Sequence, residues 1–248
     1  MSRTQAFQTT CWSEIVAAGT QDASRRREAL GEIAAQYWKP VYAYLRRRGL
    51  SPDQAEDLTQ GFFEEIILER ELVRRADRQR GRFRSFLLTA LDRYVSSAWR
   101  AERARKRRPA GPLLSLEAAD PRSMPEPSCG GTPEQIFFYT WAAQLLHEAL
   151  SQTEAECRQA GQRKHWEAFR QIVLEPLLGN TDAPKSGQLC NDRGAERKTD
   201  LANMSVTVKR RFARVLRARV RAMVDTDAAV NQEIRELMGI LSRGGAIS

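Results

Sequence analysis

The sequence is poor in the residues from which most active sites are built. Its 248 residues include only two histidines, His147 and His165, and neither has carboxylates at a metal-ligand spacing. The chain has no glycine-rich phosphate loop and no nucleophile elbow. Because common types of catalysis have little to work with here, we expect a protein that is not an enzyme, with no catalytic residues, no cofactor and no metal.

Cysteines and long apolar runs are also scarce. The four cysteines, Cys11, Cys129, Cys157 and Cys190, are far apart and form no CxxC pair, which indicates neither a zinc site nor a disulfide framework. No stretch approaches the roughly 18 uninterrupted apolar residues of a membrane span, and no apolar run follows the opening residues. We therefore expect a soluble, cytoplasmic protein without a membrane partner.

Positive charge is abundant. Lysine and arginine number 40 against 31 aspartates and glutamates, a formal net charge of +9, which favours a polyanionic partner. Apolar residues recur at helical spacing along most of the chain and predict an all-α protein. A stretch rich in proline and glycine, 109–131, predicts a flexible linker between two helical domains, 1–108 and 132–248.

A helix expected from about Gly81 to Arg108 organises the first domain. Its apolar stripe is core: Phe83, Phe86, Leu87, Ala90, Leu91, Tyr94, Val95 and Ala98. The opposite face holds Ser85, Thr89, Arg93, Ser96, Trp99, Arg100 and Arg103. A tryptophan among arginines suits nucleic acid, because arginines neutralise phosphates and an exposed indole stacks on an unpaired base. The same face also suits a solvated helix whose Trp99 packs beneath a neighbouring element.

A second helix begins at a strong start signal. Ser51 supplies an N-cap, Pro52 the first helical position and Gln54 a capping-box partner. Its outward face is acidic in an otherwise basic chain and includes Asp53, Glu56, Asp57, Gln60 and Glu64. Judged on the helix alone, this pattern indicates ordinary solvation with acids placed near a helix N-terminus.

The second half ends in a long basic helix, expected from Thr199 or Ser205 to Val224. Val206, Val208, Phe212, Val215, Leu216 and Val220 are expected inward. Its other face carries only bases before Asp225: Lys209, Arg210, Arg211, Arg214, Arg217, Arg219 and Arg221. A brief helix at 188–190, a turn at Gly194 and this helix are the parts of a helix-turn-helix, which favours DNA binding over simple solvation. A last amphipathic helix, around 230–241, is expected to pack on this second domain.

The order of these elements resembles the extracytoplasmic-function group of bacterial RNA polymerase sigma factors. The segment 37–46 is similar to the opening helix of sigma region two, and 55–63 to the signature with which that region grips the polymerase clamp. The segment 81–108 resembles the part that reads and melts the minus-ten element. The segment 204–212 resembles the recognition helix of region four, which binds the minus-thirty-five element, although 191–202 departs from the usual compact spacing.

The resemblance implies a function in promoter recognition and melting during transcription initiation. Its partners would be the clamp coiled coil of the polymerase core, promoter DNA and, as a further regulator, an anti-sigma factor. The implied polymerase-binding residues are Asp53, Glu56, Asp57, Gln60 and Glu64. The implied minus-ten residues are Arg93, Ser96, Trp99, Arg100 and Arg103. The implied minus-thirty-five residues are Thr207, Lys209, Arg210, Arg211 and Arg214.

Two other kinds of protein fit the same basic helices. One is a helix-turn-helix regulator with an effector-binding N-terminal domain, and the other is a nucleoid-associated or RNA-binding protein. The acidic helix separates these hypotheses, because only a sigma factor needs a surface for docking to polymerase.

Overall fold

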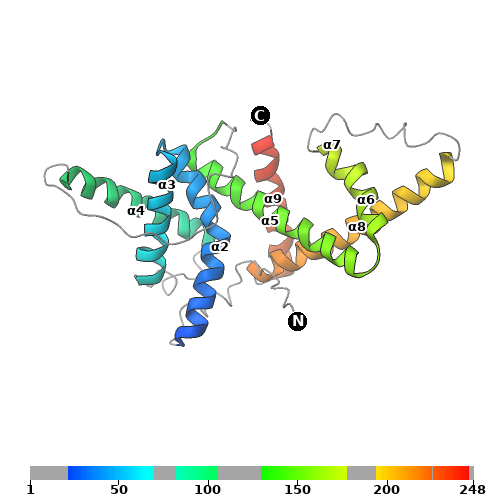
Figure 1. Ribbon diagram of the computed structural model, residues 1–248, viewed down its shortest axis with the longest axis horizontal. Coiled ribbons are helices and arrows are strands. Elements are labelled where there is room, and N and C mark those ends of the chain that lie inside the picture. The colour runs from blue at the N-terminus through cyan, green and yellow to red at the C-terminus, as the bar shows by residue number, and fades with distance from the viewer. Residues whose placement is uncertain (1–21, 70–81, 106–129, 178–193, 225, 246–248) are drawn as a thin grey trace. The chain divides into compact units, whose positions relative to one another are not determined.

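The computed structural model describes residues 22–69, 82–105, 130–177, 194–224 and 226–245 (Figure 1). All regular elements in these ranges are helical and none is a strand, which confirms the predicted all-α class. The linker expected at 109–131 falls almost wholly outside the described residues, as does the brief helix expected at 188–190. Within the same ranges, no helix is long and apolar enough to cross a membrane.

The helices of the first half are α2 (Ala23–Arg47), α3 (Pro52–Gly61), the π-helix η1 (Phe62–Glu69) and α4 (Phe83–Arg105). The second half contains α5 (Pro133–Gln159), α6 (Arg163–Phe169), the π-helix η5 (Arg170–Leu174) and α7 (Glu175–Leu177). Two further helices, α8 (Gly194–Met223) and α9 (Asp227–Gly245), complete the described chain.

Capping boxes start two of these helices, and the first is the one predicted at Ser51. At α3 the Ser51 hydroxyl accepts from the Gln54 N–H at 3.3 Å, and the Gln54 amide oxygen accepts from the Ser51 N–H at 3.0 Å. Thr132 and Gln135 repeat the arrangement before α5, with distances of 3.3 and 2.9 Å. Each pair satisfies two backbone donors that a helix start otherwise leaves without partners.

Two local features differ from the expected helices. A proline inside a helix usually kinks or ends it, but α2 runs through Pro40 as one helix, with Pro40 buried. The acidic helix was expected as one α-helix, but its second half is the π-helix η1. A π-helix adds a residue to each hydrogen-bonded turn, and both Phe62 and Phe63 are buried at its start.

The described helices group into two compact units that do not follow the expected domain boundaries. Among the described residues, unit 1 combines those up to Gln144 with those from Ala222 onward, and unit 2 comprises those from Leu145 to Arg221. The first part of α5 therefore belongs to unit 1 and the rest to unit 2. The C-terminal helix α9 also belongs to unit 1.

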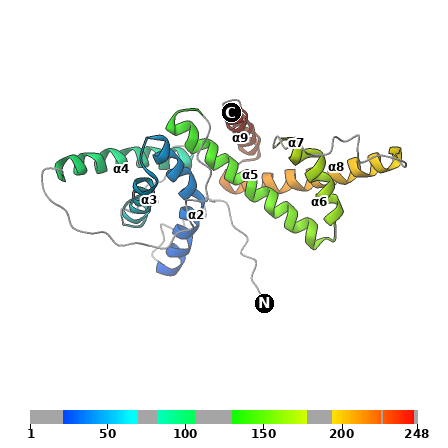
Figure 2. The same ribbon diagram turned by 45° about the horizontal axis from the view of Figure 1, so that its top comes forward.

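The core of unit 1 is built from aromatic and aliphatic side chains of α2, η1, α4 and α5. Tyr37 on α2 packs edge-on to Phe83 of α4 at 5.6 Å between ring centroids and stacks on Phe137 of α5 at 6.4 Å. The α3 helix lies beside α2 in both views (Figure 1, Figure 2). Gly61 allows a close approach to α4, because a Cβ there would lie 2.5 Å from the Tyr94 hydroxyl.

Unit 2 has its own smaller core. Cys157 of α5, Phe169 of α6 and Val208 of α8 are its buried centre. Leu150, Trp166, Val173 and Leu174 pack around them. The apolar face predicted for α8 is confirmed at Val208, Val215, Leu216 and Val220, which are buried, whereas Val206 is exposed.

The expectation that the last helix packs on the second domain is wrong. Glu233 of α9 is buried, and its carboxylate pairs with the buried Arg84 at the start of α4. Arg82 lies 2.8 Å from the same carboxylate and also pairs with Glu236. The Arg84 guanidinium sits 4.4 Å from the centroid of the Trp141 ring of α5. The ion pairs with α9 join residues about 150 positions apart, so helical periodicity carried no sign of them.

Candidate nucleic-acid interface

The acidic face on α3 and η1 consists of Asp53, Glu56, Asp57, Gln60 and Glu64. Asp53 and Asp57 are exposed, and the other three side chains are half-buried. Ala55 and Thr59 are buried on the opposite side of the helix, where the Thr59 hydroxyl donates to the Ala55 carbonyl at 2.6 Å. Because the side of the helix with Ala55 and Thr59 is buried, the carboxylates on the opposite side face outward.

The acidic face is continuous across the change from α-helix to π-helix. Gln60, near the end of α3, donates through its amide to the Glu64 carboxylate at 3.0 Å in η1. This bond spans the junction between the two helical types. A π-helical turn inside a helix is common at functional positions.

Five residues on the basic face of α4 are expected to contact the minus-ten element, and four of them are exposed. Arg93, Ser96, Trp99 and Arg100 are all exposed. Arg103 lies within α4, but its side chain is outside the described part. Arg100 folds back along its own helix, donating to the Ser96 carbonyl at 3.1 Å and to the Ser97 hydroxyl at 3.3 Å.

Trp99 is held by a neighbour that the sequence analysis missed. The Arg48 guanidinium, at the end of α2, lies 5.2 Å from the centroid of the Trp99 ring. The same guanidinium donates to Asp92 at 2.7 Å and to the Tyr44 hydroxyl at 2.8 Å. Trp99 is nevertheless 36% exposed, so part of its indole stays accessible.

Tyr44 and Asp92 fix the position of this arginine. The Tyr44 hydroxyl donates to Asp92. Burial and this hydrogen bond raise the pKa of the Tyr44 hydroxyl well above its usual value, so Tyr44 keeps its proton at physiological pH. The basic run at 46–48 was a signal for Arg48, but only the packing of α2 against α4 shows which of these arginines reaches Trp99.

The proposed minus-thirty-five residues lie in the middle of α8 and not at a helix start. We expected the recognition helix to begin at Thr199 or Ser205, but α8 is a 30-residue helix that begins at Gly194. Thr207, Lys209 and Arg210 are exposed, and the Thr207 hydroxyl donates to the Asn203 carbonyl at 3.0 Å.

The basic face of α8 is partly neutralised by acids of α5. Arg214 pairs with Glu156, and Arg211 lies 3.9 Å from the same carboxylate while donating to the Cys157 sulfur at 3.0 Å. Arg219, expected on the outward face, is buried and ion-paired with Glu148 at 2.8 Å. The absence of acids after Asp200 in α8 therefore does not leave all of its bases available to a binding partner.

Comparison with known proteins does not assign the chain to a family. No protein-family model, curated protein or solved structure matches the chain.

Proposed function

We propose that this protein is a sigma factor, which directs the RNA polymerase core to promoters and assists their melting. The observation that carries the proposal is the occurrence of two surfaces of opposite charge in unit 1. The acidic face suits a basic protein surface, and the α4 face with Trp99 suits an opened DNA strand.

An outward acidic face distinguishes this proposal from a nucleoid-associated protein or a simple repressor. Such proteins bind polyanions through their whole charged surface and gain nothing from clustered carboxylates. A basic coiled coil of the polymerase, in contrast, gains both attraction and orientation from them.

The proposal also assigns contact with the upstream promoter DNA to α8. Lys209 and Arg210 are exposed, whereas Arg211 and Arg214 are engaged with Cys157 and Glu156. We therefore narrow the upstream contacts to Thr207, Lys209 and Arg210.

The test is capture of bacterial RNA polymerase core by the immobilised full chain. We expect Asp57→Arg, and Gln60 and Glu64 changed together to Lys, to weaken capture more than about tenfold, because charge reversal opposes a basic coil. Glu28→Arg is the matched control, since Glu28 is an exposed acid of α2 outside the acidic face. Undiminished capture by the folded acidic-face variants would overturn the docking assignment.

A further inference from the structure

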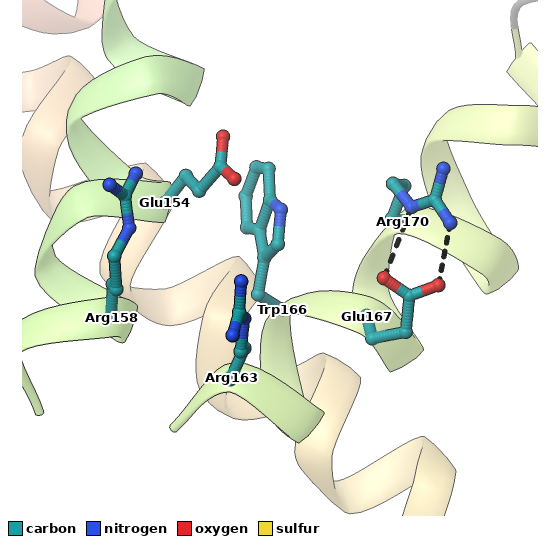
Figure 3. A pocket seen from close by; sticks show the side chains of 6 residues that line it. All are labelled: Glu154, Arg158, Arg163, Trp166, Glu167 and Arg170. Atoms are coloured by element: carbon teal, nitrogen blue, oxygen red, sulfur yellow. Dashed lines mark hydrogen bonds and ion pairs between the residues drawn. The ribbon is translucent and has the colours of Figure 1, made fainter. Parts of the chain in front are cut away.

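Unit 2 contains a cavity that neither proposed DNA surface uses. It has a volume of about 400 Å³ and lies between the end of α5 and the α6–η5 segment (Figure 3). Its lining is one aromatic ring with three cations and two carboxylates: Glu154, Arg158, Arg163, Trp166, Glu167 and Arg170.

A tight turn between α5 and α6 positions one side of the cavity. Gly161 has φ +68°, the left-handed conformation that glycine favours after a helix. The Gln162 N–H donates to the Cys157 carbonyl at 2.8 Å and the Gly161 N–H to the Arg158 carbonyl at 3.2 Å, the two bonds of a Schellman motif. The motif places Arg158, just before the turn, and Arg163, just after it, along the same cavity.

Trp166 supplies a flat surface that the core holds in place. Its ring packs against Phe169 of the unit 2 core at 5.6 Å between centroids. In Figure 3 the indole stands between Glu154 on one side and the Glu167–Arg170 pair on the other. The ring is half-buried, so it is anchored and still offers surface to a ligand.

The charged residues divide into an ion-paired group around Arg170 and a set without hydrogen-bonded or ion-paired partners in the described part of the chain. Glu154, in the second set, acts on Arg170 only through its charge at longer range. Arg170 donates to Glu167 at 2.6 and 3.2 Å and lies 3.2 Å from Glu175. The side chains of Arg158, Arg163 and Glu154 make no hydrogen bond or ion pair within the described part of the chain. Two cations, one carboxylate and one aromatic surface are therefore available to a ligand.

We propose that this cavity binds a nucleoside phosphate. The base stacks on Trp166, and the phosphate is held by Arg158 and Arg163, because stacking and guanidinium pairing are the two strong contacts that such a ligand offers. An ionised carboxylate is an acceptor only, so Glu154 selects a base edge with two adjacent N–H donors, as in guanine. This site is independent of the proposed sigma function.

The test is isothermal titration calorimetry of the full chain with 5′-GMP, 5′-AMP, inorganic phosphate and a guanine-rich single-stranded oligonucleotide. We expect GMP to bind more tightly than AMP or phosphate. Arg158→Ala combined with Arg163→Ala, and separately Trp166→Leu, should weaken GMP binding at least about tenfold. Glu154→Gln should remove the preference for GMP over AMP. Tighter binding of the oligonucleotide than of GMP would identify a strand as the source of the nucleotide, and the reverse would identify a free nucleotide.

Lys164→Ala is the matched control, because Lys164 is an exposed cation of α6 that does not line the cavity. Circular dichroism of each variant checks that the helices remain, and the arginine and Glu154 variants carry the test if Trp166→Leu unfolds. The proposal is overturned if neither GMP nor the oligonucleotide binds, if phosphate binds as tightly as GMP, or if Lys164→Ala weakens binding as much as the arginine variants.

Discussion

The basic helices α4 and α8 look alike in sequence but use their arginines differently. At the beginning of α4, Arg84 and the preceding Arg82 pair within the protein, where α9 supplies Glu233 and Glu236. Farther along α4, Arg93 and Arg100 are exposed. On α8, internal pairs and exposed bases alternate along the helix.

This difference shows that the number of bases on one face of a helix is larger than the number available to a binding partner. In α8 the pairing acids, Glu148 and Glu156, come from α5. An ion pair with a neighbouring helix is invisible in the charge pattern of the basic helix itself. Exposed bases such as Arg210 are therefore the ones to test for DNA binding, and buried pairs such as Arg219 the ones to test for stability. Arg214 is exposed but ion-paired with Glu156, so it measures how far pairing lowers the contribution of an exposed base to DNA binding.

The largest effect is expected where α9 meets α4. Glu233→Ala leaves the buried Arg84 with only its longer contact to Glu236, at 3.6 Å, and we expect it to lower the free energy of unfolding by about 3–5 kcal/mol. Urea denaturation followed by circular dichroism measures this. The exposed Arg235→Ala of the same helix is the control and should change stability by less than about 0.5 kcal/mol.

The double variant Arg84→Met with Glu233→Leu sharpens the same point. Replacing both charges by apolar groups removes the uncompensated charge, so most of the lost stability should return. If Glu233→Ala were as stable as the unaltered protein, the ion pair would not be what holds α9 to α4.

Arg219→Met tests the internal pairs of α8. Its guanidinium bonds to Glu148 at 2.8 Å and to Gln152 at 3.1 Å in a buried position, so its loss should cost about 1.5–3 kcal/mol of unfolding free energy. Arg210→Met, an exposed arginine of the same helix, is the matched control. Equal thermal unfolding of the two variants would remove the distinction between paired and exposed arginines.

The converse experiment measures DNA affinity. We expect Arg210→Ala to weaken binding to promoter duplex by about 1–3 kcal/mol, because an exposed arginine is available to DNA. Arg214→Ala should cost less than half as much, since Glu156 already compensates its charge. Fluorescence anisotropy at several salt concentrations gives both values, and a larger loss for Arg214→Ala would contradict the comparison.

Trp99→Ala separates binding from opening. Stacking contributes about 1–3 kcal/mol only after a base has left the duplex, so the variant should bind closed duplex normally and form fewer open complexes. Permanganate footprinting of promoter thymines with polymerase core detects this. Arg48→Met, which removes the cation beside the Trp99 ring, should show a smaller loss of the same kind. An equal loss of duplex affinity and opening in Trp99→Ala would refute the assignment.

The smallest expected effect is a pH dependence of stability that arises from Glu236, a partly exposed residue where α9 contacts the start of α4. The hydrogen bond from Arg82 lowers the pKa of Glu236 below its usual value. A carboxylate with a lowered folded-state pKa stabilises the protein at neutral pH, and this contribution is lost as pH falls through that pKa. Glu236→Gln should therefore destabilise by up to about 1 kcal/mol at pH 7, given its partial exposure, and by less in acid. Urea midpoints from pH 7 down to pH 3 should converge, and a constant difference would contradict this.

Local signals in the sequence determined where α3 and α5 begin and which face of α4 is buried. The capping box at Ser51 formed as predicted, and Thr132 follows the same local pattern, because the hydrogen bonds of both join residues three positions apart. The apolar stripe of α4 is buried at Phe83, Leu87 and Leu91 for the same reason, since helical periodicity places these side chains on one face. The acidic face and the exposed position of Trp99 were also local consequences of helical spacing.

The tertiary structure alone decided which helices share a core and which charges remain available. The pairing of Arg84 with Glu233 assigns α9 to unit 1, and Arg48 reaches Trp99 only because α2 packs against α4. The acids of α5 likewise neutralise Arg214 and Arg219 on another helix. Each of these contacts joins residues more than forty positions apart. Such pairings depend on how whole helices pack, and the spacing of residues within one helix carries no information about them.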